Sequence, residues 1–253
     1  IMFRRWLKKL GQKRHWTTLL QNFSDADYQR SRDVELRCYN VRALYGREQR
    51  KKALDWTTDL WLSPKSQPKA CDPIFDVWRT TPRFTEEIAW QRFDAAIKNN
   101  QRKLSRYLLR FFTGTNKRAA EAYYQVHTQP KRVAKRSRFA RDNAQNRSII
   151  QHGLMRLSRN GAEDAAKAWA RYAETHSFSP VQRSIIEEHI QIGLARGGTF
   201  PGAAERAQFT SSFATQGLAE AALGKDGGAT KIMQALGFGL QGTGPGAKVT
   251  NPP

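Results

Sequence analysis

A proline-punctuated segment of the chain reads Leu60-Trp61-Leu62-Ser63-Pro64-Lys65-Ser66-Gln67-Pro68-Lys69-Ala70-Cys71-Asp72-Pro73-Ile74-Phe75-Asp76-Val77-Trp78. Apolar residues recur at helical spacing before this segment, and the same spacing resumes after Asp72-Pro73. Sustained alternation of period two, which would indicate strands, does not occur. The segment and its surroundings therefore predict helices joined by short loops, and so an all-α protein.

The segment carries one of the chain's two cysteines, Cys71, and the other, Cys38, lies on the preceding helical pattern. Their separation fits a single disulfide between one helix and the loop after the next helix, and such a bridge persists in an oxidising compartment. The separation also fits two reduced cysteines that are buried apart from each other. Zinc is disfavoured because no CxxC or HxxxH pair accompanies the cysteines.

Helix starts are marked by capping residues further along the chain. Thr85 followed by Glu86 and Glu87 predicts one start, and Ser179-Pro180-Val181-Gln182 predicts a capping box. Further helices are predicted over 104–112, 118–127, 144–158 and 162–175. Short helices in close succession bury their apolar faces most simply by stacking, so we expect an α-solenoid, or superhelix, of short helical hairpins.

The composition changes after Gly224, because glycine becomes abundant from there to the C-terminus. Glycine-rich segments bury too little apolar surface to compensate for ordering the chain. We therefore expect an α-superhelical domain over residues 1–222 and a disordered Gly-rich C-terminal tail over residues 223–253. A brief helix over 230–236 is compatible with the pattern of the tail.

The chain has 253 residues and a formal net charge of +21 at pH 7, which indicates an anionic partner. Nucleic acid, anionic lipid and carboxylate-bearing cell-wall polymer all meet this requirement. No apolar run approaches the roughly 18 residues of a transmembrane helix, so we expect no membrane span. The chain begins Ile1-Met2 and lacks the apolar stretch of a signal peptide, so we expect a fragment whose export signal is not present.

The densest run of positive charge is the sequence PKRVAKRSRFAR, from Pro130 to Arg141. On a helix, several of its basic side chains would share a face that attracts anions, while Val133 and Phe139 would form the packing side. The other interpretation is an ordinary solvated helix face. The candidate residues for binding an anionic polymer are Lys131, Arg132, Lys135, Arg136, Arg138 and Arg141.

Residues of catalytic type are present but form no recognisable constellation, and we assign no catalytic residue. Glu121, Glu187 and Glu188 lie at helix-surface positions, and adjacent helical residues point about 100° apart. The five histidines are scattered without ligand spacing, so we expect no metal and no cofactor. The tryptophans mostly share stripes with Leu or Phe, which favours core packing over a sugar-binding groove.

A family resemblance is carried by Asp59-Leu60-Trp61-Leu62, Lys65-Ser66-Gln67-Pro68, Ala70-Cys71-Asp72 and Phe75-Asp76-Val77-Trp78-Arg79. With these residues the chain resembles the soluble lytic murein transglycosylases. The resemblance extends upstream to Arg5-Trp6-Leu7, Arg14-His15-Trp16 and Glu35-Leu36-Arg37-Cys38-Tyr39, and loosely downstream to about Gly198. In that family the matching segment belongs to the superhelical, U-type domain that precedes the catalytic domain.

The resemblance implies a periplasmic enzyme of peptidoglycan turnover. Such an enzyme cleaves the N-acetylmuramyl to N-acetylglucosamine linkage without water and forms a 1,6-anhydro product. The resemblance also implies that Cys38 and Cys71 pair. The family's catalytic Glu-Ser pair is absent from this sequence, and Gly153-Leu154-Met155-Arg156 echoes a second family motif by coincidence.

We therefore expect a superhelical scaffold domain, truncated or frame-shifted before the catalytic domain and inactive alone. Its expected partners are peptidoglycan glycan strands and a separate catalytic domain. The sequence leaves open whether the chain itself is an enzyme. The alternative is a standalone basic helical-repeat adaptor or RNA-binding module that uses residues 131–141 on phosphate groups.

Overall fold

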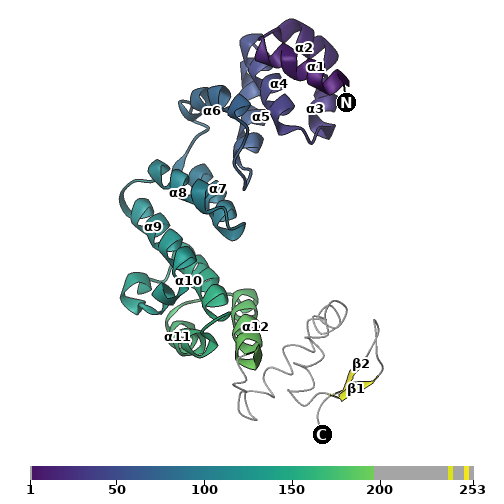
Figure 1. Ribbon diagram of the computed structural model, residues 1–253. Helices are drawn as coiled ribbons and strands as arrows, with labels where there is room; N and C mark the ends of the chain where they lie inside the picture. The colour runs from purple at the N-terminus through teal and green to yellow at the C-terminus, as the bar shows by residue number, and fades with distance from the viewer. Residues whose placement is uncertain (1, 197–238, 242–247, 251–253) are drawn as a thin grey trace. The chain divides into compact units, whose positions relative to one another are not determined.

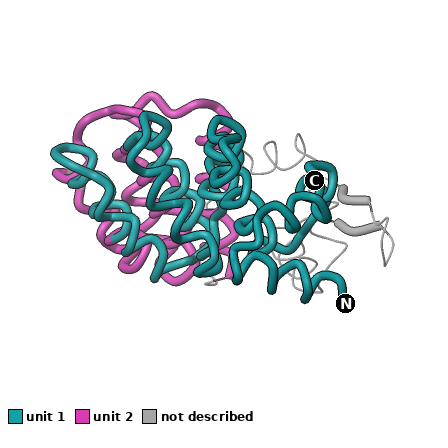
Figure 2. Tube along the Cα trace, turned by 90° about the horizontal axis from the view of Figure 1, so that it is seen from above, with its two compact units in different colours: residues 1–124 teal, residues 125–253 magenta. Residues whose placement is uncertain are grey.

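The computed structural model of the chain describes residues 2–196, 239–241 and 248–250. The chain divides into two compact units, residues 1–124 and residues 125–253, which are coloured separately in Figure 2. The boundary between the units falls within helix α9 (Gly114–Thr128). Each unit is described by itself, and a single superhelical domain over 1–222 stays a prediction.

Unit 1 consists of short helices that pack against near neighbours in the sequence (Figure 1). Helices α1 and α2 both pack on α4, α5 packs on α4 and α6, and α7 packs on α8. The helices before α9 are α1 (Met2–Gln12), α2 (Trp16–Asn22), α3 (Asp25–Arg30), α4 (Val34–Gly46), α5 (Arg50–Trp61), α6 (Asp72–Arg79), α7 (Glu86–Lys98) and α8 (Arg102–Leu108), with the 3-10 helices η1 (Lys69–Cys71) and η2 (Leu109–Phe111).

The helix boundaries of unit 1 follow from local chemistry. Asp33 caps α4 by accepting a hydrogen bond from the backbone nitrogen of Leu36 at 3.2 Å. The expected cap of α7 is present, because the Thr85 hydroxyl accepts from the backbone nitrogen of Ile88 at 3.3 Å. Asp72, by contrast, is the first residue of α6 and not its cap, because the preceding 3-10 turn runs directly into the helix.

Trp61 lies at the centre of the aromatic core of unit 1. The side chains of Trp61 and Trp78 are 1% and 0% exposed. Edge-to-face and tilted aromatic pairs contribute about 0.5–1.5 kcal/mol each beyond the burial of their area. Four other rings have centroids between 5.3 and 5.6 Å from that of Trp61: Phe75, Trp78, Phe84 and Phe111.

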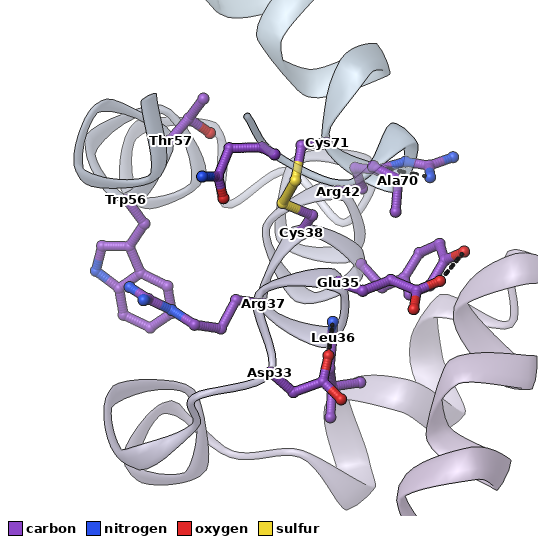
Figure 3. Close-up of a disulfide and its surroundings, with 12 residues drawn as sticks. Asp33, Glu35, Leu36, Arg37, Cys38, Arg42, Trp56, Thr57, Ala70 and Cys71 are labelled. Carbon is purple, nitrogen blue, oxygen red and sulfur yellow. Dashed lines mark hydrogen bonds between the residues drawn. A yellow bond between two sulfur atoms is a disulfide. The ribbon is translucent and has the colours of Figure 1, made fainter. Parts of the chain in front are cut away.

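A disulfide between Cys38 of α4 and Cys71 of η1 ties α4 to the proline-punctuated segment (Figure 3). The two Cα atoms are 4.9 Å apart, and both residues are fully buried. Beside the bridge, Arg42 Nη1 donates to the carbonyl oxygen of Ala70 at 3.3 Å. The disulfide expected from the sequence is therefore present.

The described part of unit 2 contains the end of α9, two 3-10 helices, three further α-helices and two short strands. Helix α10 packs on η3, α11 and α12. A Cβ at Gly153 would lie 2.6 Å from Val126 Cγ1 and 2.8 Å from Val133 Cβ, so only glycine lets α10 approach so closely. The elements are η3 (Pro130–Ala134), η4 (Arg136–Phe139), α10 (Ala144–Leu157), α11 (Ala162–Thr175), α12 (Pro180–Arg196), β1 (Gly239–Gln241) and β2 (Lys248–Thr250).

The predicted all-α class is confirmed for residues 2–196. The capping box at the start of α12 is present, since Ser179 and Gln182 exchange backbone-to-side-chain hydrogen bonds of 3.1 and 3.2 Å. Within the tail that was predicted to be disordered, β1 and β2 form an antiparallel pair. The sequence did not predict these strands. The rest of the tail, including the helix considered over 230–236, lies outside the described residues.

Two helix boundaries differ from the sequence prediction. The helix expected over 104–112 ends at Leu108, a 3-10 turn follows, and Phe112 is extended with its ring 5.5 Å from that of Phe93. Helix α9 begins earlier than expected, at Gly114, whose φ of +49° glycine tolerates. The helix expected over 104–112 ends early because Phe112 packs against Phe93. A contact between such distant residues leaves no local signal in the sequence.

Glu86 links the start of α7 to the start of α9. Its carboxylate accepts hydrogen bonds from the backbone nitrogen and the hydroxyl of Thr113, at 2.7 and 2.6 Å, and another from the Asn116 side chain. These hydrogen bonds, that of Asn116 first, lower the pKa of Glu86 below its ordinary value. The charged carboxylate therefore stabilises the contact between the two helices.

We predict that removing the disulfide lowers the stability of unit 1. The bridge closes a loop with a sequence separation of 33 residues, for which the chain-entropy model gives about 4 kcal/mol. Urea unfolding of Cys38→Ala/Cys71→Ala, followed by tryptophan fluorescence, measures the loss, since every tryptophan except Trp169 lies in unit 1. The same loss should follow reduction of the unaltered chain, and an unchanged urea midpoint in both cases would contradict the prediction.

We predict a second effect, on acid stability, from Glu86. Its folded-state pKa is lowered, so its stabilising contribution is present above the unfolded-state pKa of about 4.3 and is lost as pH falls through the folded-state value. The variant Glu86→Gln should therefore be less stable than the unaltered chain at pH 7 and should lose stability less steeply below about pH 5. Urea midpoints between pH 7 and pH 3 measure this, and parallel curves for the two proteins would contradict it.

Candidate functional site

The proline-punctuated segment and helices α5 to α8 line an open pocket of about 280 Å³ within unit 1. Three cationic side chains line it, one each from α6, α7 and α8: Arg79, Arg92 and Lys103. One carboxylate, Asp72 at the start of α6, lies among the lining residues. The pocket therefore has an excess of positive charge.

Arg92 is the buried cation of this pocket, with only 3% of its surface exposed. Its guanidinium carbon lies 4.2 Å from the ring centroid of Trp61, and Nη2 donates to the carbonyl oxygen of Lys65 at 3.4 Å. Its Nε is buried and makes no hydrogen bond. Burial, with a smaller contribution from the charge of Arg79, lowers the pKa of Arg92 to about 10, so the group remains charged at neutral pH.

Arg79 adds a second guanidinium over the same ring, with its Cζ 5.6 Å from the centroid of Trp61. It forms an ion pair with Asp76, which is not among the lining residues of the pocket. Asp76 therefore orients Arg79 on the helix surface. Cation–π contacts hold both guanidinium groups over Trp61 and contribute about 0.5–2 kcal/mol each.

The remaining walls combine polar side chains of the loop with apolar side chains of the helices. Ser66 and Gln67 come from the loop, and the Gln67 amide donates to the carbonyl oxygen of Lys65 at 2.9 Å. Phe75 is buried, whereas Tyr107 is 38% exposed and forms an accessible wall. Guanidinium groups bind carboxylates through paired hydrogen bonds, so the pocket can hold a small anion.

The sequence interpretation missed this pocket, although one signal was present. Arg92 shares a face of α7 with the buried residues Ala89, Phe93 and Ala96. A charged residue on the buried face of a helix needs a partner, and is often functional. Its position on the helix could have been recognised, but not the loop and the second arginine that surround it.

The basic run of residues 130–141 has a different backbone from the single helix face that the sequence predicted. It forms the two 3-10 helices η3 and η4, separated at Lys135. Its packing side is as expected, because Val133 is 0% and Phe139 1% exposed. Tyr172 Oη donates to the carbonyl oxygen of Val133 at 2.8 Å, so α11 anchors the run.

The basic side chains of this run do not share one environment. Arg132 donates to Gln125 at 3.2 Å and to Gln129 at 2.6 Å, and Arg138 also donates to Gln125. The structure does not describe the side chain of Arg136. Lys131, Lys135, Arg138 and Arg141 are exposed, so they form a charged surface in unit 2 that stays a candidate for binding an anionic polymer.

The carboxylates considered for catalysis do not line the pocket. Glu187 accepts a hydrogen bond from Trp169 Nε1 at 3.1 Å. Glu121 lies on α9 and Glu188 on α12, and neither is among the lining residues of the pocket. Gly153 sits where α10 meets Val126 and Val133, which supports a packing role for the Gly-Leu-Met-Arg stretch.

Two of the histidines lie beside each other in unit 2. His127 Nδ1 and His152 Nε2 lie 3.1 Å apart, a pairing that the sequence did not predict. Across the described residues, no group of three or more His, Cys, Asp or Glu side chains could hold a metal ion.

Trp61, Trp78 and Trp169 are buried, as expected for core residues, whereas Trp6 is 41% exposed. None of the described helices is both long and apolar enough to span a membrane.

The sequence is similar to curated proteins over part of its length. It is 26% identical over 161 residues to the soluble lytic murein transglycosylase of Salmonella typhimurium, which covers 64% of this chain and 24% of that protein. The soluble lytic murein transglycosylase of Escherichia coli K12 matches with the same identity and coverage. The chain thus spans about a quarter of the length of these relatives. A comparison with models of known protein families finds no match.

The fold is similar to that of solved lytic transglycosylases. An inactive mutant of the Pseudomonas aeruginosa enzyme Slt matches with a TM-score of 0.66 and 24% identity, over 93% of this chain and 36% of that chain. The 70-kDa soluble lytic transglycosylase of Escherichia coli matches with a TM-score of 0.70 and 19% identity, over 92% and 38%. A complex of the 70-kDa soluble lytic transglycosylase with bulgecin A gives a TM-score of 0.71 and 21% identity, over 88% and 35%.

We predict that the charge of Arg92 is not required for folding. Arg92→Met should leave the free energy of unfolding unchanged within about 1 kcal/mol or raise it, because Met fills a similar space without an unpaired buried charge. Arg92→Ala should lower it by about 2 kcal/mol or more, because it leaves a cavity beside Trp61. Urea unfolding followed by tryptophan fluorescence measures both variants, and equal destabilisation by Met and Ala would contradict the prediction.

Proposed function

We propose that this chain, which is related over part of its length to the soluble lytic murein transglycosylases, is a non-catalytic superhelical scaffold for peptidoglycan turnover. The observation that carries the proposal is the sequence relationship over 161 residues. The similar fold of solved lytic transglycosylases agrees with it. In this role the chain would hold peptidoglycan glycan strands near a separate catalytic domain and would not cleave them itself.

The charge of the chain supports peptidoglycan as the partner. The formal net charge is +21, and muramyl peptides carry carboxylates that would be attracted to it. In unit 2 the exposed side chains of Lys131, Lys135, Arg138 and Arg141 are anchored to the core through Val133 and Phe139. We therefore propose this surface as a contact for the anionic polymer.

The disulfide supports a periplasmic location. Cys38 and Cys71 are bonded and fully buried. Structural disulfides persist in oxidising compartments, and they are rare where thiols are kept reduced. A protein that acts on peptidoglycan in the periplasm meets this condition, whereas an RNA-binding role in the cytosol does not.

We predict salt-sensitive retention of the purified chain by peptidoglycan sacculi in a sedimentation assay. The variant Lys131→Gln/Lys135→Gln/Arg141→Gln should be retained about 5- to 10-fold less at low salt, since exposed ion pairs contribute roughly 0.2–1 kcal/mol each. A matched control removes three exposed charges elsewhere, in Lys51→Gln/Lys117→Gln/Arg118→Gln, and should change retention much less.

Four outcomes would contradict the proposal. Retention that does not respond to salt would exclude the electrostatic contact, and equal losses in both triple variants would exclude a specific role for residues 131–141. Tighter binding to RNA than to sacculi would favour the alternative adaptor function. Release of anhydro-muropeptides from the same incubation would show that the chain is itself catalytic.

A further inference from the structure

We propose that the pocket around Arg92 binds the free carboxylate of a short peptide. The pocket lies within unit 1, far in sequence from the basic run of residues 130–141. The proposal rests on the geometry of this pocket alone and does not require the role in peptidoglycan turnover. Either idea can therefore fail without the other.

The first argument is the unpaired charge of Arg92. In the part of the chain that the structure describes, no carboxylate forms an ion pair with it, and its buried Nε makes no hydrogen bond. A buried charge is costly unless it is paired, so a fold that retains one without a counter-ion is incomplete as it stands. A ligand carboxylate would supply the missing partner.

The second argument is the arrangement of charge around Arg92. Arg79 and Lys103 line the same pocket, and Arg79 is oriented by its ion pair with Asp76. The two guanidinium groups lie 4.2 and 5.6 Å from the centroid of the same Trp61 ring. Like charges held near each other repel, and one bound anion relieves this repulsion while accepting paired hydrogen bonds.

The third argument concerns the kind of anion. Of the described residues that line the pocket, only Asp72 carries a carboxylate, and it would repel a second negative charge on a ligand. The same side chain can accept a hydrogen bond from a ligand N–H group. A ligand with one carboxylate and an amide N–H fits this pattern better than a phosphate, which carries a charge of about −1.5 to −2 at pH 7.

The fourth argument concerns size and lining. A volume of about 280 Å³ lies just below the range of about 300–1,000 Å³ that is typical of small-molecule pockets, so it suits a dipeptide better than a long polymer. The loop side chains Ser66 and Gln67 can hydrogen-bond peptide groups. Leu104 and Tyr107 offer an apolar wall for a small side chain.

The test compares two ligands that differ only in the terminal charge. The full chain is titrated with acetyl-Ala-Ala, which has a free carboxylate, and with the same dipeptide as its C-terminal amide. The assigned indole N–H signal of Trp61 in NMR spectra reports on the pocket, because Arg92 lies over its ring. We expect the carboxylate form to shift this signal saturably and the amide to bind at least 10-fold more weakly.

Variants identify the residues responsible. Arg92→Met should weaken binding of acetyl-Ala-Ala at least 10-fold. Lys103→Gln, at an exposed position, should weaken it about 3-fold. The control Arg106→Met removes an exposed arginine of the same helix α8 that does not line the pocket, and it should leave the affinity unchanged.

Four results would overturn the proposal. Two concern the ligands: equal binding of the carboxylate and the amide, and binding of inorganic phosphate as tight as that of acetyl-Ala-Ala or tighter. Two concern the variants: an affinity that Lys103→Gln leaves unchanged, and a loss of affinity in Arg106→Met equal to that in Arg92→Met. The sacculus assay does not enter this test, so its outcome does not affect these conclusions.

Discussion

The aromatic contacts of Trp61 are the constraint on which unit 1 depends. Trp61 is the last residue of α5, and its ring contacts four others: Phe75, Trp78, Phe84 and Phe111. These contacts stabilise the folded state, whereas the disulfide between Cys38 and Cys71 chiefly restricts the unfolded chain. Because they act on different states, both can stabilise the same segment. The loop over 62–68 meets α7 where Arg92 Nη2 donates to the carbonyl oxygen of Lys65 at 3.4 Å.

The relationship with the soluble lytic murein transglycosylases that the resemblance indicated is confirmed by the comparisons. The residues that carry the resemblance in the sequence include Ser66 and Gln67 of the loop, which line the pocket, and Trp61 beneath the two arginines. The proline-punctuated segment therefore stabilises the fold of unit 1 and also lines the pocket. Packing alone accounts for the buried aromatic residues of this motif, but not for its exposed polar ones.

Much of the fold could be predicted because its signals are local. The hydroxyl of Thr85 and the capping box of Ser179 act within one turn, so sequence alone identifies these helix starts. The predictions fail where distant residues decide, as at Phe112 and in the run over 130–141. Arg92 combines both cases. Its helix face follows from spacing, whereas its surroundings come from α5, the loop, α6 and α8, which no spacing rule brings together.

The chain carries two kinds of positive charge that act over different ranges. Exposed lysines and arginines attract any polyanion, but salt screens them over roughly 8 Å at physiological ionic strength. Only 3% of the surface of Arg92 is exposed, so its charge is screened little and would act strongly on an anion bound in the pocket. The exposed cations therefore attract polyanions over long range, whereas Arg92 distinguishes between small anions at short range. Asp72 completes the second function, because a carboxylate beside the cations disfavours ligands that carry more than one negative charge.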